Sequence, residues 1–292
     1  MSKSIISLLI ALTLILCLGA CSKAPAAPAI TGSGTADDPW TIGATADDDI
    51  TAYLTEDYQL EINGTGAMMD FNSPDDTPWA DSMSKITAIN VWDARSIGAN
   101  AFKGAGADNE NYIDFFLPTE KLDEIGDSAF ENAKLGTGDF FCITINSDIK
   151  RVGSRAFANV GLTEVQAYCS PENIEADAFA DNSGKFYATA LTGYNWDDSS
   201  FDKFEGDFEP HYLFAVKYKE QFNTDEISNS EGVMNVPDDQ PFEYDASVLY
   251  EEEGFKFAKY EIVTGNLDID ATNPVINTEL TGNIEMFVYY EK

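Results

Sequence analysis

Few residues in this chain have the chemistry that catalysis needs. His211 is the only histidine, which excludes sites that need several histidines; no histidine-based triad, dyad or zinc cluster is assigned, and we expect it to lie in a linker between domains. No glycine-rich phosphate loop or dinucleotide fingerprint is present. Pairs of carboxylates, which glycosidases use, are inevitable among 51 acidic residues. The sequence therefore predicts a protein that is not an enzyme and uses no cofactor.

Oxygen-rich segments raise calcium binding as an alternative. The segments 47–49 and 108–111 and the Asp268/Asp270 pair offer the carboxylate and amide oxygens that calcium prefers. None has the spacing of a dedicated loop with its central glycine and distal glutamate. Solvated loops are the favoured interpretation and no metal ligands are assigned, although a calcium-stabilised surface module stays open.

Cys21 has neighbours that indicate a covalent modification. It follows Lys3 and an uncharged stretch, residues 5–16, that is too short to span a bilayer and fits the core of a signal peptide. Leu18-Gly19-Ala20-Cys21 resembles the bacterial lipobox, the alternative being an ordinary signal peptide with a chance cysteine. The resemblance implies that the Cys21 thiol carries diacylglycerol, which with two acyl chains is a stable anchor. We expect the protein in the cell envelope, lipid-anchored to a bacterial membrane and facing the exterior.

The composition excludes other partners. Seventeen basic residues against 51 acidic ones give a net charge of −34, and such a surface repels the phosphate backbone of nucleic acids. The favoured interpretation of the acidity is a soluble, repulsive surface, and a monomer is expected. A hydrophobic content of 44% is too high for a disordered chain.

The chain contains an internal repeat with the pattern (I/V)-G-x-x-A-F. Copies begin at Ile97, Ile125 and Val152, a fourth without the glycine begins at Ile174, and their phenylalanines are 28, 27 and 22 residues apart. A β-prone segment precedes each copy (86–92, 113–117, 141–145, 162–168). A strand, a turn and an aromatic repeated at this period predict a solenoid, in which the glycine allows a tight turn. The predicted core residues are Ile97, Phe102, Ile125, Phe130, Val152, Phe157, Ile174 and Phe179.

This pattern resembles the BspA-type leucine-rich repeats of bacterial surface proteins. Residues 117–130 (LPTEKLDEIGDSAF) match the repeat closely, and residues 60–71 with Pro78-Trp79 resemble the capping region. The resemblance covers roughly residues 46–200 and implies a leucine-rich-repeat solenoid with an amino-terminal β cap. Two units carry insertions, around 104–111 and 135–140, and the last is expected to be a terminal unit that faces solvent.

The repeat spacing predicts the state of two cysteines. Cys17 is removed with the signal peptide, which leaves Cys142 and Cys169 in a compartment that permits a disulfide. Cys142 lies ten residues before Val152, whereas Cys169 lies five before Ile174. An offset of five strand residues is about 16 Å, beyond the roughly 7 Å limit between the Cα atoms of a disulfide. Two free thiols are therefore expected.

The repeat stops near residue 208, where alternating strands begin. Phe214, Val216 and Tyr218 point to one side of a strand, as do alternate residues of 284–290. The order of strand, acidic stretch, G-F-x-F segment at 254–257, loop and final tyrosine-rich strand resembles the divergent internalin-type B-repeat, although Tyr260 stands where that family often has Trp. The resemblance implies a small β-grasp-like domain that acts as a spacer or accessory binding unit.

Together these patterns predict a mainly β protein of five segments. They are a lipoprotein signal peptide (1–20), the lipidated cysteine with a flexible tether (21–36), a β capping region (37–85), the solenoid (86–207) and the B-repeat-like domain (208–292). By strand alternation Trp92, Phe116, Asn146 and Tyr168 should project outward, and the three rings form a possible binding face. The predicted function is adhesion to an extracellular protein or glycan, and the alternative is a structural or spacer lipoprotein without a ligand.

Overall fold

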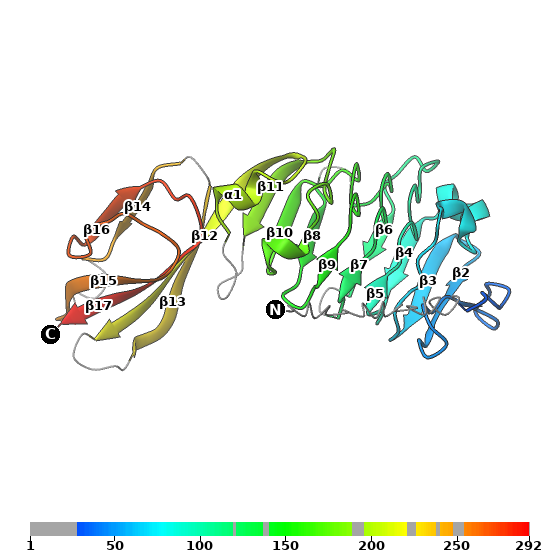
Figure 1. Ribbon diagram of the computed structural model, residues 1–292, viewed down its shortest axis with the longest axis horizontal. Coiled ribbons are helices and arrows are strands. Elements are labelled where there is room, and N and C mark those ends of the chain that lie inside the picture. The colour runs from blue at the N-terminus through cyan, green and yellow to red at the C-terminus, as the bar shows by residue number, and fades with distance from the viewer. Residues whose placement is uncertain are drawn as a thin grey trace, which may run out of the picture.

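The computed structural model describes residues 28–118, 121–136, 140–188, 196–220, 226–237, 240–247 and 254–291, without the side chains of residues 220 and 226–233. The predicted signal peptide and Cys21 lie outside this part. The described chain is built mainly of strands, which confirms the expected fold class. An elongated stack of coils leads into a second β domain at the carboxy-terminal end (Figure 1).

The amino-terminal part begins with a sheet in the order β1-β2-β3-β4-β6. Its first pairs are antiparallel, and β3, β4 and β6 then run parallel, as successive coils of a solenoid do. Three short 3₁₀ helices, η1 (Pro74–Asp76), η2 (Ala80–Lys85) and η3 (Pro171–Asn173), lie in the connections. The strands of this sheet are β1 (Trp40–Thr41), β2 (Ile50–Leu54), β3 (Gln59–Gly64), β4 (Ala88–Val91) and β6 (Asp114–Phe116).

Later coils add two further parallel rows. The short strands β5 (Ser96–Ile97), β7 (Glu124–Ile125) and β9 (Arg151–Val152) carry the start of the repeat pattern and pair in that order. The longer strands β8 (Cys142–Ile145), β10 (Glu164–Ala167) and β11 (Ser183–Ala188) form the second row. Each coil thus contributes one strand to each of two walls, and the repeat side chains fill the space between them.

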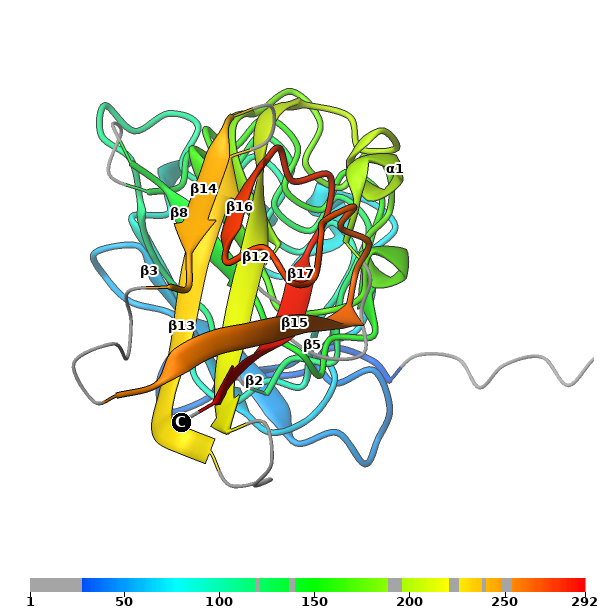
Figure 2. The ribbon, with the colours of Figure 1, turned by 90° about the vertical axis from the view of Figure 1, so that its left-hand side faces the viewer.

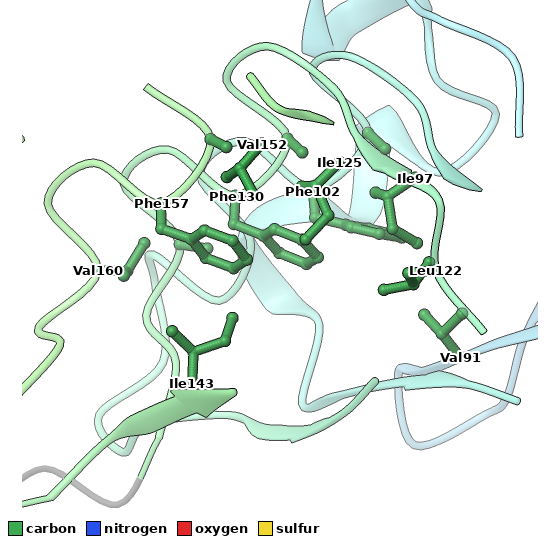
Figure 3. Packing of buried hydrophobic residues seen from close by; sticks show 14 of the residues in the cluster. Val91, Ile97, Phe102, Leu122, Ile125, Phe130, Ile143, Val152, Phe157 and Val160 are labelled. Carbon is green, nitrogen blue, oxygen red and sulfur yellow. The ribbon is translucent and has the colours of Figure 1, made fainter. Parts of the chain in front are cut away.

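The phenylalanines of the repeat form a continuous stack in that space (Figure 3). All four are fully buried, and the centroids of Phe102 and Phe130, and of Phe130 and Phe157, are 5.1 Å apart with nearly parallel rings in the second pair. Phe179 continues the stack at 6.0 Å from Phe157. Ile97, Ile125, Val152 and Ile174 are also buried, as the pattern predicts.

Two tryptophans close the ends of this stack. Trp79 stacks on Phe102 at 5.8 Å and its indole N–H donates to the carbonyl of Ala101. At the other end Trp196 lies 5.3 Å from Phe186, which contacts Phe179, and its indole N–H donates to the carbonyl of Cys169. Each ring covers apolar surface while its one polar group is satisfied, so both ends of the core are closed.

The repeat glycines have a different role from the expected tight turn. The backbones of Gly98, Gly126 and Gly153 are not in the positive-φ region. A Cβ atom on Gly126 would instead lie 2.5 Å from the backbone nitrogen of Ala99 in the preceding coil. Glycine is therefore required because two coils approach closely. Residues with left-handed backbone conformation lie elsewhere in each coil, for example Ser128 (φ 53°) and Asn132 (φ 60°).

The segment predicted as tether is partly folded. Residues 31 and 41 bond through their backbones, Leu54 N donates to the carbonyl of Gly34, and Ile30 packs against the core. The expectation of a flexible tether up to residue 36 is therefore wrong for residues 30–36, which form part of the cap. The chain turns closely there, and the backbone N–H groups of Ser33 and Gly34 both donate to the carbonyl of Asp38.

The carboxy-terminal domain is a sheet with a small two-stranded antiparallel sheet, β14 (Phe242–Asp245) paired with β16 (Val275–Thr278), on one face (Figure 2). Phe214, Val216 and Tyr218 all enter its core, as their alternation predicts, and the Phe214 ring is 4.5 Å from that of Phe242. The α-helix α1 (Asp198–Phe201), which has a capping box at Asp197, precedes this domain. The strands of the carboxy-terminal domain are β12 (Asp207–Glu220), β13 (Glu226–Pro237), β14, β15 (Lys256–Thr264), β16 and β17 (Ile284–Glu291).

The two domains share one strand. The first part of β12 pairs with β11 of the solenoid, and the rest pairs with β13 and β17, so a single sheet runs through both domains. His211 pairs with Tyr187 on β11 and with Pro237 on β13, and its side chain is buried. The expectation that His211 lies in a linker is therefore wrong, because β-sheet pairing continues across the boundary.

Both remaining cysteines are free, as predicted. Cys142 of β8 pairs with Glu164 of β10, and Cys169 lies five residues beyond Glu164, which is the expected offset. Cys169 is fully buried, and burial raises the pKa of both thiols to about 12. They serve as small packing residues and not as reactive groups.

Candidate functional site

The outward face of the first sheet gathers residues from four strands. In the strand register, Tyr53 of β2 lies opposite Glu61 of β3, Glu61 opposite Asn90 of β4, and Asn90 opposite Phe116 of β6. Trp92 follows β4 directly and its backbone N–H donates to the carbonyl of Ile62. We call this set, Tyr53, Glu61, Asn90, Trp92 and Phe116, the aromatic face.

Two rings on the aromatic face are exposed although they contact each other. Trp92 is 48% exposed and Phe116 is 46% exposed, and their centroids are 5.1 Å apart at an angle of 39°. Neighbouring side chains of the strands, Ile89, Val91 and Phe115, point the other way, into or against the solenoid core. Strand alternation therefore fixes both rings toward solvent.

Glu61 holds the aromatic face in place. Its Oε2 accepts from the indole Nε1 of Trp92 at 2.9 Å, and its Oε1 accepts from the Asn90 amide at 2.8 Å. Hydrogen bonds to an ionised carboxylate are the stronger kind. The carboxylate thus limits rotation of the indole, and a ring that is already ordered loses less conformational entropy when a ligand covers it.

The other predicted members of the binding face have different positions. Tyr168 is also exposed, at 41%, but it follows β10 and no ring contact joins it to Trp92 or Phe116 among the described residues. The Asn146 side chain forms hydrogen bonds with backbone groups of the solenoid. Its Oδ1 accepts from the backbone N–H groups of Asp148 and Ile149, and its Nδ2 donates to the carbonyl of Leu122. The structure therefore brings together two of the three predicted rings, and the expectation for Asn146 is wrong.

Tyr53, Glu61 and Asn90 were not among the predicted site residues. Tyr53 and Glu61 lie in the antiparallel cap, before the first repeat, so the repeat pattern gives no signal for them. The period-2 alternation of β3 (Gln59, Glu61, Asn63) was the one available indication that Glu61 faces outward.

The oxygen-rich segments have structural roles. Asp48 accepts from the backbone N–H of Ala67 and from Thr45, and these bonds lower its pKa. Asp270 accepts from the side chain and backbone N–H of Thr272, which lowers its pKa as well. Within the described ranges, no cluster of three or more His, Cys, Asp and Glu side chains is suited to hold a metal ion.

The repeats identify the class of protein. Residues 80–185 match the family model described as "BspA type Leucine rich repeat region", in six copies. The sequence pattern had indicated four copies. The solenoid is therefore a BspA-type leucine-rich-repeat region. Such repeats are typical of surface-exposed bacterial proteins, are typically non-enzymatic and generally act as protein-interaction modules.

One solved structure is similar in part. It is the crystal structure of a leucine-rich repeat protein from Eubacterium ventriosum, with 16% sequence identity and a TM-score of 0.25. The match covers 59% of this chain and 36% of that chain, so it spans well under two thirds of that protein's length. No curated protein matches the sequence. The resemblance of residues 208–292 to the internalin-type B-repeat stays a prediction.

In the part of the chain that the structure describes, no helix combines the length and the apolar character that crossing a bilayer requires.

Proposed function

We propose that this chain is a non-enzymatic adhesion module at the exterior of a bacterial cell, monomeric and held there by the lipid on Cys21. Its ligand, an extracellular protein or glycan, contacts the aromatic face. The observation that carries the proposal is the pair of ordered, half-exposed rings of Trp92 and Phe116 on the strand face of a repeat solenoid.

The exposure of these two rings supports a binding role on energetic grounds. Single exposed apolar side chains are common and need no explanation, but adjacent ones mark contact sites more often. Covering apolar area contributes roughly 25 cal/mol per Å². Tryptophan is also enriched among the residues that carry most of the energy at interfaces. A ligand on this face would gain from both rings without a rearrangement of the strands.

The binding proposal is tested by substitution on the aromatic face. Immobilised full chain is incubated with cell-surface and matrix extracts, and the bound proteins and glycans are compared with those held by Trp92→Ala and Phe116→Ala variants. We expect a partner that the wild type retains and both variants lose. Tyr112→Ala is the matched control, because Tyr112 is a similarly exposed ring (43%) that lies beside Lys134. Equal retention by wild type and both variants would contradict the role of this face.

The anchor is tested separately. Replacement of Cys21 by Ala removes the thiol that the lipobox resemblance marks for acylation, so we expect loss of palmitate labelling and of partitioning into the detergent phase. Cys142→Ala is the control, because Cys142 packs in β8. Full labelling of the Cys21→Ala protein would overturn the lipoprotein assignment.

A spacer role is the second candidate, and one observation favours it. The shared strand β12 joins the two domains into one sheet without an intervening linker, which is what a rigid support needs. Reproducible absence of any partner in the extract experiment would favour this function over adhesion.

A further inference from the structure

The aromatic face carries charge of one sign. The strands β2, β3, β4 and β6 contain no lysine or arginine, and their acidic residues are Glu61 and Asp114. Asp114 is exposed and lies two residues before Phe116, on the same face of β6. Among the ion pairs of the described residues, none includes Glu61 or Asp114.

Several cations of the solenoid pair with acids other than Glu61 and Asp114, and Lys121 pairs with Asp93, the residue after Trp92. Arg95 and Lys150 flank Asp123, at 3.8 and 3.0 Å, and Lys103 and Arg155 flank Glu131, at 2.6 and 2.8 Å. Arg151 pairs with Glu124, Asp127 and Glu175. In a chain with 17 basic residues against 51 acidic ones, these pairings leave the charge of the aromatic face uncompensated.

We infer that the segment which binds the aromatic face is cationic polypeptide, with an arginine or lysine that meets Trp92 and Glu61. This inference rests on the proposed function and adds the chemistry of the ligand. A guanidinium group stacks on an indole and forms hydrogen bonds to a carboxylate, and one group can do both where the two lie together. Asp114 receives a second basic side chain, and Phe116 covers the apolar stem of either one.

A neutral glycan fits the same face less well. Sugar hydroxyls need donors as well as acceptors, and two donors beside the rings, one N–H of the Asn90 amide and the Trp92 indole N–H, already donate to Glu61. A glycan would also leave Glu61 and Asp114 without a counter-charge while it removes water from them, which is costly. A cationic side chain supplies that counter-charge.

The net charge of −34 acts in the same direction. The field of an acidic protein raises the rate at which a cationic partner arrives, and salt weakens it because the Debye length falls from about 10 Å at 0.1 M to about 3 Å at 1 M. A basic ligand is therefore attracted from a distance and retained at the aromatic face, where two exposed rings lie beside acidic groups.

The test uses the purified full chain and two synthetic peptides, one that alternates arginine and leucine and one in which citrulline replaces each arginine. We expect binding of the arginine peptide only, weakened about tenfold by Glu61→Gln, by Asp114→Asn and by Trp92→Ala, and weakened further in 0.5 M salt. Glu172→Gln is the control, because Glu172 is exposed on η3, far along the chain from this face, and the substitution changes the net charge by the same amount.

Three outcomes would overturn the inference, and they are distinguishable. Equal weakening by Glu172→Gln would show that the peptide responds to net charge and not to this face. Equal binding of the citrulline peptide would show that the rings do not require a cation. In the extract experiment, loss of the partner with Trp92→Ala but not with Glu61→Gln or Asp114→Asn would leave the proposed function intact and identify a neutral ligand such as a glycan. Retention by all variants would contradict the proposed function itself.

Discussion

Glu131 connects three coils of the solenoid through one carboxylate. It accepts from Lys103 Nζ at 2.6 Å and from Arg155 Nε at 2.8 Å, and Arg155 also donates to Asp181 at 3.0 Å. Burial by itself would raise the pKa of Glu131, but the hydrogen bonds from Lys103 and Arg155 outweigh it and lower the pKa to about 2. A buried charge with two cationic partners stabilises the fold only while it is ionised.

The pH dependence of stability should reflect this carboxylate. Because its pKa in the folded state lies below its ordinary value of 4.5, its contribution is complete above pH 4.5 and is lost as the pH falls toward 2. We expect Glu131→Gln to lower the free energy of unfolding by about 2–3 kcal/mol at pH 7 and by much less near pH 2.5. Urea denaturation at both pH values measures this, with Glu172→Gln as control. A loss that does not change with pH would contradict it.

At the scale of the repeat unit, the phenylalanine stack and the close approach of the coils depend on each other. The Phe130 ring has a neighbouring ring on each side, and its backbone N–H donates to the carbonyl of Ala156 in the next coil. Gly126 lies against the coil before it. A larger residue at position 126 would push its coil away from the preceding one. The distance between these two coils is what brings the rings of Phe102 and Phe130 into contact.

We expect Phe130→Ala or Phe157→Ala to cost about 3–5 kcal/mol, the range for truncation of a fully buried phenylalanine. Phe116→Ala, on the aromatic face, is the matched control and should cost less than about 1 kcal/mol because its ring is half exposed. Chemical denaturation measures all three. A loss below about 1 kcal/mol at Phe130 would mean that the stack contributes little to stability.

In the whole molecule, the joint between the domains lies at His211. Its Nε2 is buried without a hydrogen-bond partner, and its ring centroid is 4.5 Å from that of Tyr187. Glu209 on its own strand is 3.5 Å away, and Lys185 on β11 and Glu164 on β10 also act on it. Burial lowers the pKa of His211, Lys185 lowers it too, and the two glutamates oppose this without reversing it.

The joint should therefore weaken in mild acid. Because the pKa of folded His211 lies below its ordinary value of 6.5, the unfolded chain binds a proton first, and stability present above pH 6.5 declines as the pH falls below it. We expect wild type to lose more stability than His211→Gln between pH 7.5 and pH 5.5. Denaturation of both proteins measures the difference, and hydrogen exchange of β11 and β12 locates it. Identical pH dependence would contradict this account.

The sequence by itself determined the solenoid of this protein. Spacings of 28, 27 and 22 residues placed a phenylalanine in each of four coils, and local counting from each repeat predicted the offset that keeps Cys142 and Cys169 apart. These features follow from the sequence because a repeated pattern produces the same contacts between every pair of neighbouring coils.

The tertiary structure decided whatever depends on contacts between different segments. Glu61 orients Trp92 from 31 residues away, Trp196 closes the core over Phe186, and Asn283 bonds the carbonyl of Ala188 across 95 residues of sequence. The close contact between coils at the repeat glycines and the strand shared by both domains are features of the same kind. Each depends on how two backbone segments that are distant in the sequence pack together. The repeat pattern does not specify such contacts, so the positions of Tyr53, Glu61 and Asn90 beside the two predicted rings, and the joint at His211, become visible only in the folded chain.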